Sequence, residues 1–137
     1  MAAGGEKIRV LLAKSEIDAH DRGVRYVARK LMEAGFEVIF IRYAIPDDIL
    51  TAALQEDVDV IGISFSTGTP MLVIPRVLDL LKKQELNDIA VIVGGIIPDA
   101  IVPELKDKGV TDVFGPGSDP AGIIDKIKLA VANRPSA

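Results

Sequence analysis

Hydrophobic residues in this chain form short, nearly unbroken runs that alternate with segments of helical periodicity. Runs of this kind are typical of strands buried on both faces of a parallel sheet. They cover residues 8–13, 38–41, 58–64, 89–93 and 111–114. Between and after them, apolar residues recur at helical spacing over residues 22–34, 46–55, 71–83, 102–108 and 120–132. The pattern predicts five strands, each followed by a helix.

Several residues mark where the predicted helices begin and end. Asp21 precedes the first helix as a candidate cap, and Gly35 ends it. Pro46 begins the second helix, and Pro75 is placed in about the first turn of the third. Gly109 ends the fourth. These signals support the element bounds given by the hydrophobic pattern.

Strict alternation of strands and helices favours an α/β fold with a doubly wound parallel sheet and right-handed crossovers. Five strands suit the flavodoxin-like (Rossmann-like) order 2-1-3-4-5, in which ligands bind beyond the carboxyl ends of the strands. The length of 137 residues suits a single domain, 1–137, with its core at about 7–132.

Composition narrows the possible functions. A net charge of -4 and a pI near 5.0 argue against a nucleic-acid partner. The absence of cysteine excludes disulfides and thiolate metal sites, and is compatible with a reducing compartment. No apolar run approaches the ~20 residues of a membrane span, and residues 1–6 do not resemble a signal peptide. We expect a cytoplasmic protein without membrane association.

The chain contains one histidine, His20, two residues after Asp18. A carboxylate can accept the proton of one ring nitrogen, which leaves the other nitrogen free for a metal. A lone histidine in a loop is, by itself, more often an ordinary surface residue. Because the chain has no second histidine and no cysteine, a metal on His20 would have to bring most of its ligands with a cofactor.

Unusual segments follow four of the five predicted strands. They are Lys14 with Asp18-x-His20-x-x-Gly23, Ser64-Phe65-Ser66-Thr67-Gly68, Gly94-Gly95-Ile96 and Phe114-Gly115-Pro116-Gly117. Each alone has a structural explanation as a turn, a helix cap or a weak phosphate nest. The predicted sheet places all four on one edge, where Ser64, Gly94 and Gly95 would line a slot for a planar aromatic ring.

Together these segments resemble the cobalamin-binding domain of methylmalonyl-CoA-mutase-type enzymes over about residues 7–132. The most specific part is Asp-x-His-x-x-Gly, followed by the serine motif and the glycine pair. The resemblance implies adenosylcobalamin bound base-off and histidine-on, with His20 as the lower ligand of cobalt. It makes Asp18 the hydrogen-bond partner of His20 and Lys14 the adjoining cation.

The same resemblance implies that the displaced nucleotide tail enters the slot and that residues 114–117 close around its far end. The implied cofactor contacts are Asp18, His20, Asp21, Arg22, Gly23, Ser64, Ser66, Thr67, Gly68, Gly94, Gly95, Ile96, Phe114, Gly115, Pro116 and Gly117. Four stretches depart from the family pattern: 15–19 lacks the usual glycines, Ser66 replaces leucine, and 42–45 and 69–70 are atypical. We expect these departures to change the tail-pocket contacts rather than cobalt ligation.

In this family the reaction is a radical carbon-skeleton rearrangement of an acyl-CoA, an isomerase activity. The substrate-binding barrel has no counterpart in these 137 residues. The resemblance therefore implies the small subunit of a heteromeric mutase, inactive without a large TIM-barrel subunit that binds the acyl-CoA. Methylmalonyl-, isobutyryl- and 2-hydroxyisobutyryl-CoA types remain open as substrates.

Two alternatives share parts of this pattern. A corrinoid carrier of a methyltransferase system has the histidine motif but generally also an N-terminal helical bundle, whereas about six residues precede the first predicted strand. A receiver-type signalling domain needs an aspartate at the end of the third strand and paired acids after the first. Ser64 and Ala13-Lys14 occupy those positions, which excludes it.

Overall fold

The computed structural model describes residues 7–66 and 70–134, and it contains one five-stranded parallel sheet in the order β2-β1-β3-β4-β5. The strands are β1 (Arg9–Ser15), β2 (Glu37–Tyr43), β3 (Val60–Phe65), β4 (Ala90–Gly95) and β5 (Asp112–Phe114). This order confirms the flavodoxin-like prediction.

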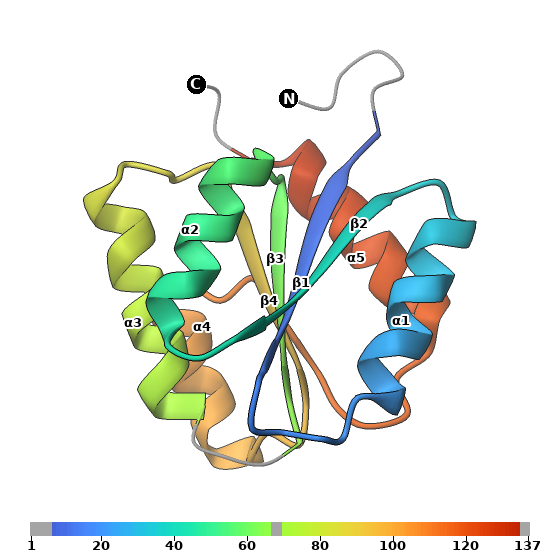
Figure 1. Ribbon diagram of the computed structural model, residues 1–137, viewed down its shortest axis with the longest axis horizontal. Coiled ribbons are helices and arrows are strands. Elements are labelled where there is room, and N and C mark those ends of the chain that lie inside the picture. The colour runs from blue at the N-terminus through green and yellow to red at the C-terminus, as the bar shows by residue number, and fades with distance from the viewer. Residues whose placement is uncertain (1–6, 67–69, 135–137) are drawn as a thin grey trace.

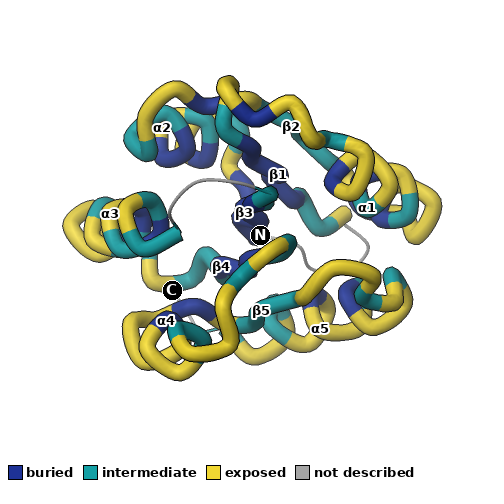
Figure 2. Tube along the Cα trace, turned by 90° about the horizontal axis from the view of Figure 1, so that it is seen from below, coloured by how far each residue is buried: buried dark blue, intermediate teal, exposed yellow. Residues whose placement is uncertain are grey.

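Helices cover both faces of the sheet (Figures 1 and 2). One face carries α1 (Arg22–Glu33) and α5 (Pro120–Ala132). The other carries α2 (Pro46–Glu56), α3 (Pro70–Lys83) and α4 (Val102–Lys108), the last preceded by the short 3-10 helix η1 (Asp99–Ile101). Within the described ranges, none of these helices is long and apolar enough to cross a bilayer.

Three local predictions were wrong or incomplete. The strands β1, β2 and β4 continue further than predicted, to Ser15, Tyr43 and Gly95, because their ladders with neighbouring strands run on. Pro75 lies in the second turn of α3 rather than the first, where its missing N–H leaves one helical hydrogen bond unmade. Asp21 occupies the cap position of α1, but its side chain makes no capping bond and pairs with Arg25 instead.

Alternation along the strands divides the buried residues into two clusters. In β3, Ile61, Ile63 and Phe65 pack toward α2, α3 and α4, within the larger cluster. Val60 belongs to the smaller cluster beneath α1 and α5. Consecutive strand residues point to opposite faces, and this explains the division. The central strands β1 and β3 appear as the most deeply buried part of the layer between the two helical layers in Figure 2.

One row of aligned residues crosses all five strands near their carboxyl ends. Its members, from β2 to β5, are Arg42, Lys14, Ser64, Gly94 and Phe114. They share a strand parity with Leu12 and Ile92, so the row belongs to the α1 and α5 face. A short side chain and a missing one stand at the centre of this row, over β3 and β4.

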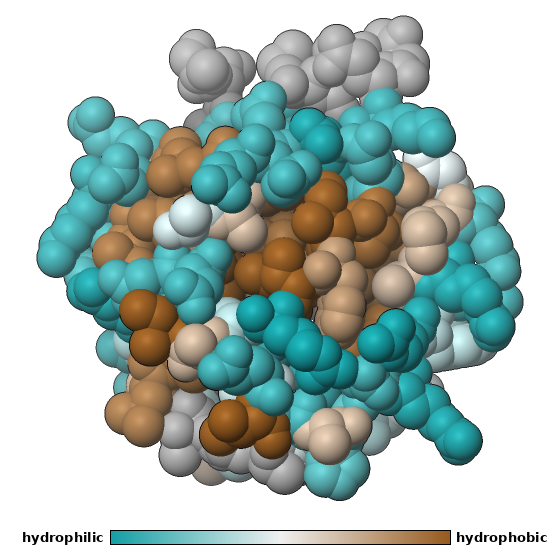
Figure 3. Space-filling view, viewed as in Figure 1, coloured by the Kyte–Doolittle hydropathy of each residue, from teal (hydrophilic) through white to brown (hydrophobic). Residues whose placement is uncertain are grey.

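Edge strand β2 is only half covered over residues 38–41, and hydrophobic atoms are visible between α1 and α2 (Figure 3).

A buried carboxylate lies at the amino ends of the strands. Asp59 accepts hydrogen bonds from the Arg9 amide at 2.8 Å and from Arg134 Nη1 at 2.7 Å. The second bond ties the chain just after α5 to the sheet.

Candidate functional site

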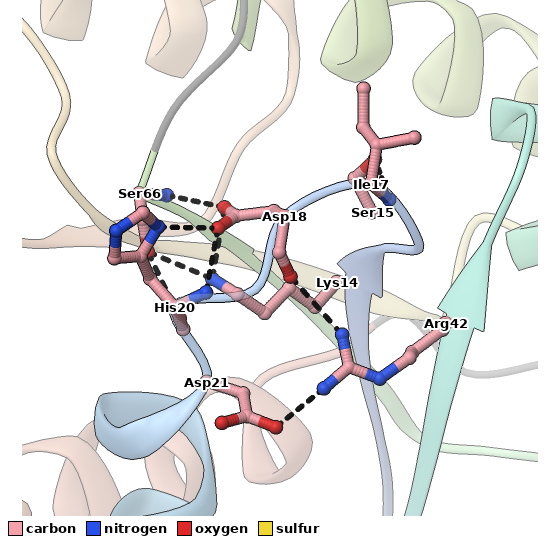
Figure 4. A network of polar contacts seen from close by, with 8 residues as sticks. All are labelled: Lys14, Ser15, Ile17, Asp18, His20, Asp21, Arg42 and Ser66. Carbon is pink, nitrogen blue, oxygen red and sulfur yellow. Dashed lines mark hydrogen bonds and ion pairs between the residues drawn. The ribbon is translucent and has the colours of Figure 1, made fainter.

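A buried ion pair lies at the carboxyl end of β1. Lys14 is completely buried, and its Nζ donates to Ser66 Oγ at 2.8 Å and pairs with Asp18 Oδ2 at 3.1 Å (Figure 4). Asp18 is 4% exposed. Desolvating an ammonium group is costly unless it is paired, so the two oxygens compensate for the burial of Lys14. The strand and the loop after it are thereby joined.

Asp18 holds the following histidine through both its backbone and its ring. Oδ1 accepts from the His20 amide at 2.9 Å and lies 3.1 Å from His20 Nδ1, while Oδ2 accepts from the Ser66 amide at 3.2 Å. Burial alone would raise the pKa of Asp18. The hydrogen bonds from His20, Lys14 and Ser66 outweigh it and hold that pKa well below its usual value.

The ionised Asp18 can only accept hydrogen bonds, and this fixes the neutral tautomer of His20. Nδ1 must carry the proton, so Nε2 keeps a free lone pair. The side chain of His20 is 73% exposed, and this second nitrogen points away from the network (Figure 4). No group of three or more candidate metal-ligating side chains occurs within the described part of the chain. His20 therefore offers one oriented nitrogen ligand and little else for a metal.

A pocket of about 540 Å³ opens beside His20, between the sheet and helices α1 and α5. Eleven of the predicted contacts line it: His20, Gly23, Ser64, Ser66, Gly94, Gly95, Ile96, Phe114, Gly115, Pro116 and Gly117. Lys14 and Asp18 lie in the network behind it. Asp21 and Arg22, at the start of α1, do not line it. Thr67 and Gly68 lie outside the described residues.

The floor of the pocket comes from residues that sequence reasoning did not single out. Leu12, Gly62 and Ile92 contribute to it from the middle of their strands, and Tyr26 of α1 lines the pocket on the helix side. A Cβ on Gly62 would come within 2.8 Å of Leu12 Cδ2, so glycine lets the Leu12 side chain lie against the β3 backbone at this point. A glycine in the middle of a central strand often marks close approach of a ligand, and it was the available signal.

The two glycines that end β4 differ in what they do. Gly95 has φ +105°, and a Cβ there would lie 2.0 Å from the Phe65 carbonyl oxygen, so the backbone itself requires glycine. A Cβ on Gly94 would have the Phe114 carbonyl oxygen as its nearest neighbour, at 3.7 Å, which is an ordinary contact. Both line the pocket. The backbone would tolerate a side chain at Gly94, so the glycine there serves to leave space in the pocket.

Two of the departures from the family pattern contact the histidine loop. Besides lining the pocket, Ser66 donates from Oγ to the His20 carbonyl at 3.1 Å. Arg42 does not line the pocket; its Nη1 donates to the Asp18 carbonyl at 3.1 Å, and its Nη2 pairs with Asp21 (Figure 4). Both residues therefore also hold the histidine loop, a contact that the sequence did not predict; that cobalt ligation is unaffected stays a prediction.

Sequence comparison places this chain among cobalamin-binding proteins. The profile of the family described as B12 binding domain matches residues 8–124. The 2-hydroxyisobutanoyl-CoA mutase small subunit of Aquincola tertiaricarbonis is 42% identical over 93% of this chain and 94% of its own length. The pivalyl-CoA mutase small subunit of Xanthobacter autotrophicus is 43% identical over 90% of this chain and 83% of its own length. Methylmalonyl-CoA mutase of Escherichia coli is 34% identical over 86% of this chain, which spans only 17% of that protein.

Solved structures agree with the fold. A cobalamin-binding protein from Desulfitobacterium hafniense superposes with a TM-score of 0.74 at 25% identity, covering 92% of this chain and 60% of the other. A signal receiver domain from Mycobacterium tuberculosis gives 0.71 at 19% identity, covering 93% and 98%, and shows the shared fold alone. The chain belongs to the B12 binding domain family, and it matches acyl-CoA mutase small subunits along nearly its whole length.

Proposed function

We propose that this chain is the cobalamin-binding small subunit of a heteromeric acyl-CoA mutase, with His20 as the lower ligand of cobalt and the cofactor's own base displaced. The observation that carries this proposal is the geometry of His20. One ring nitrogen faces Asp18 at 3.1 Å, and the other is exposed beside a pocket of about 540 Å³.

The residues present fit such a cofactor. A corrin brings four equatorial ligands of its own, so a single oriented imidazole is the donor set that it requires from the protein. The pocket volume falls in the usual range for small-molecule sites. Its lining combines glycines with apolar side chains, and Ser64 stands beside Gly94 in the cross-strand row. We assign this slot to the displaced base.

Each protein group has a distinct role in this proposal. Asp18 orients the ring and increases the basicity of the ligating nitrogen, while the buried Lys14 limits how much negative charge reaches the imidazole. Ser64 and the glycines admit the flat base and exclude water from it. When bound, the cofactor supplies a cobalt–carbon bond that starts the radical chemistry; the protein supplies ligation and orientation.

The partner in this proposal is a large subunit with a TIM barrel that binds the acyl-CoA. The names of the relatives indicate branched acyl-CoA substrates such as 2-hydroxyisobutanoyl-CoA and pivalyl-CoA. Alone, this chain should bind cobalamin without turnover. The corrinoid-carrier alternative is not favoured, because these relatives, matched along most of their lengths, are mutase subunits.

The sole histidine makes the ligand assignment directly testable. Protein labelled with ¹⁵N-histidine carries the label in one ring only. Added cobalamin should shift to the base-off absorption spectrum, and electron paramagnetic resonance of the Co(II) state should show coupling to the labelled nitrogen. His20→Ala should abolish the coupling, whereas the remote variant Thr51→Ala should retain it. Cobalamin bound by wild-type protein without this coupling would refute the histidine-on assignment.

A further inference from the structure

The loop between β1 and α1 is held from above β3 by one serine. Ser66 Oγ donates to the His20 carbonyl at 3.1 Å and lies 2.8 Å from Lys14 Nζ, from which it accepts. The Ser66 amide donates to Asp18 Oδ2 at 3.2 Å. A single residue at the end of β3 therefore contacts the backbone of His20 and both members of the buried ion pair (Figure 4).

From the opposite side, β2 holds the same loop through an arginine. Arg42 Nη1 donates to the Asp18 carbonyl at 3.1 Å, and Nη2 pairs with the Asp21 carboxylate. The guanidinium lies 5.6 Å from the centroid of the Phe40 ring, where Arg25 also lies at 5.5 Å. Arg25 Nε pairs with Asp21 at 2.8 Å. Stacking and two hydrogen bonds fix the planar fork of Arg42, which a flexible lysine would not reproduce.

The two anchors act on the carbonyl groups on either side of Ala19. Ser66 binds the carbonyl of His20 and Arg42 binds that of Asp18, so the peptide planes before Ala19 and after His20 are both held by residues outside the loop. We propose that Ser66 and Arg42 are positioning residues that order the histidine loop before any cofactor arrives. The cofactor then meets a preformed ligand, which reduces the entropy cost of binding. Only the identity of that ligand rests on the proposed function; the ordering belongs to the chain alone.

The test uses the cofactor-free protein, with the ring nitrogens of its one histidine labelled. At alkaline pH, where imidazole is neutral, nitrogen chemical shifts should show the Nδ1–H tautomer for wild-type protein. Ser66→Ala and Arg42→Ala should each shift His20 toward the tautomer mixture of free histidine. Each should also speed amide exchange of Asp18 and His20 about fivefold, as expected for the loss of one hydrogen bond.

Matched controls separate positioning from general stability. Thr51→Ala removes a hydroxyl bond to the Asp47 carbonyl, and Arg76→Ala removes an ion pair with the Asp47 carboxylate, both far from the loop in sequence and on other elements. Neither should change the His20 tautomer. Ser66→Thr keeps the hydroxyl and should therefore show the wild-type His20 tautomer. A circular dichroism spectrum like that of the wild-type protein verifies that each variant folds.

The outcomes distinguish this inference from the proposed function. Wild-type tautomer and exchange rates in both Ser66→Ala and Arg42→Ala would overturn the inference, whatever the protein binds. Cobalamin titration of the wild-type protein tests the proposed function separately. If wild-type protein binds cobalamin, the two variants should bind it more weakly by about the same factor that accelerates their loop exchange.

Discussion

Two buried aspartates lie at opposite ends of the strands and have different roles. At the amino ends of the strands, Asp59 is 6% exposed, and its oxygens accept from the Arg9 amide and from Arg134. The side chain of Arg134 is itself only 13% exposed. This network begins and ends inside the fold, and its effect is to attach the end of the chain to the sheet.

At the carboxyl ends, Asp18 is equally buried, and it too pairs with a cation, the fully buried Lys14. Its other oxygen, however, leads to His20, a ring that is 73% exposed and whose second nitrogen makes no hydrogen bond to the described residues. Burial and charge pairing are alike at the two edges. What separates a structural carboxylate from one that serves a site is whether its hydrogen-bond chain ends inside the protein or at an open surface.

The largest expected effect comes from removing the cation at each edge. Lys14→Met leaves Asp18 buried without its countercharge and should lower the free energy of unfolding by about 3–5 kcal/mol. Arg134→Met, nearer the solvent, should cost about 2 kcal/mol. Urea unfolding of both variants measures the difference. Equal losses of unfolding free energy would mean that the ion pair at the carboxyl ends of the strands contributes no more to stability than the one at the amino ends.

A second comparison lies within the carboxyl edge, between two adjacent glycines. Gly95→Ala places a Cβ against the Phe65 carbonyl at a positive φ and should cost about 3 kcal/mol of stability. Gly94→Ala meets only an ordinary contact and should change stability by about 0.5 kcal/mol or less, while narrowing the pocket and weakening cobalamin binding. Thermal unfolding and cobalamin titration of the pair test this. If Gly94→Ala destabilised the protein as much as Gly95→Ala, both glycines would be required by the fold, and Gly94 would have no separate role in the pocket.

The last expected effect appears only in acid, as a pH dependence of stability. Because the pKa of Asp18 is lower in the folded protein than its ordinary value of 3.8, its ionised form stabilises the fold. That stabilisation is complete above the ordinary value and is lost as the pH falls through the folded-state pKa. Between the two values, the unfolding free energy of wild-type protein should fall by about 1.4 kcal/mol per pH unit from this group.

Asp18→Asn is the matching control for this titration. It should be less stable at neutral pH but should show a shallower decline in acid, measured by urea unfolding at successive pH values. An unchanged acid slope in Asp18→Asn would assign the acid sensitivity of the protein to other carboxylates.

The sequence predicted what depends on local pattern. Apolar runs and the glycines and prolines that punctuate them gave the strand order and most helix bounds. The two-residue spacing of Asp18 and His20 predicted their contact, because neighbouring residues in an extended loop can reach each other. The pattern also places Lys14 at the strand end, although its hydrogen bond to Ser66, 52 residues later, is not visible in the local sequence.

What the sequence could not give is contact between distant segments. Arg42 and the Asp18 carbonyl are 24 residues apart, and Ser66 and the His20 carbonyl are 46 apart. Nothing in their local surroundings marks them as partners of the histidine loop. Gly62 is a different case: the interruption that it makes in a central strand is visible in the sequence, but the hydrophobic pattern there indicates only a buried strand.

The row from Arg42 to Phe114 has a consequence for how this protein can change over evolution. Each strand contributes one position to it, and the pleat assigns that position to one face. Inserting or deleting one residue in β1, β3 or β4 would transfer that strand's contribution to the far side of the sheet. Outward-facing helix positions can therefore diverge more freely than strand lengths, because the sheet sets the distances between the groups around His20.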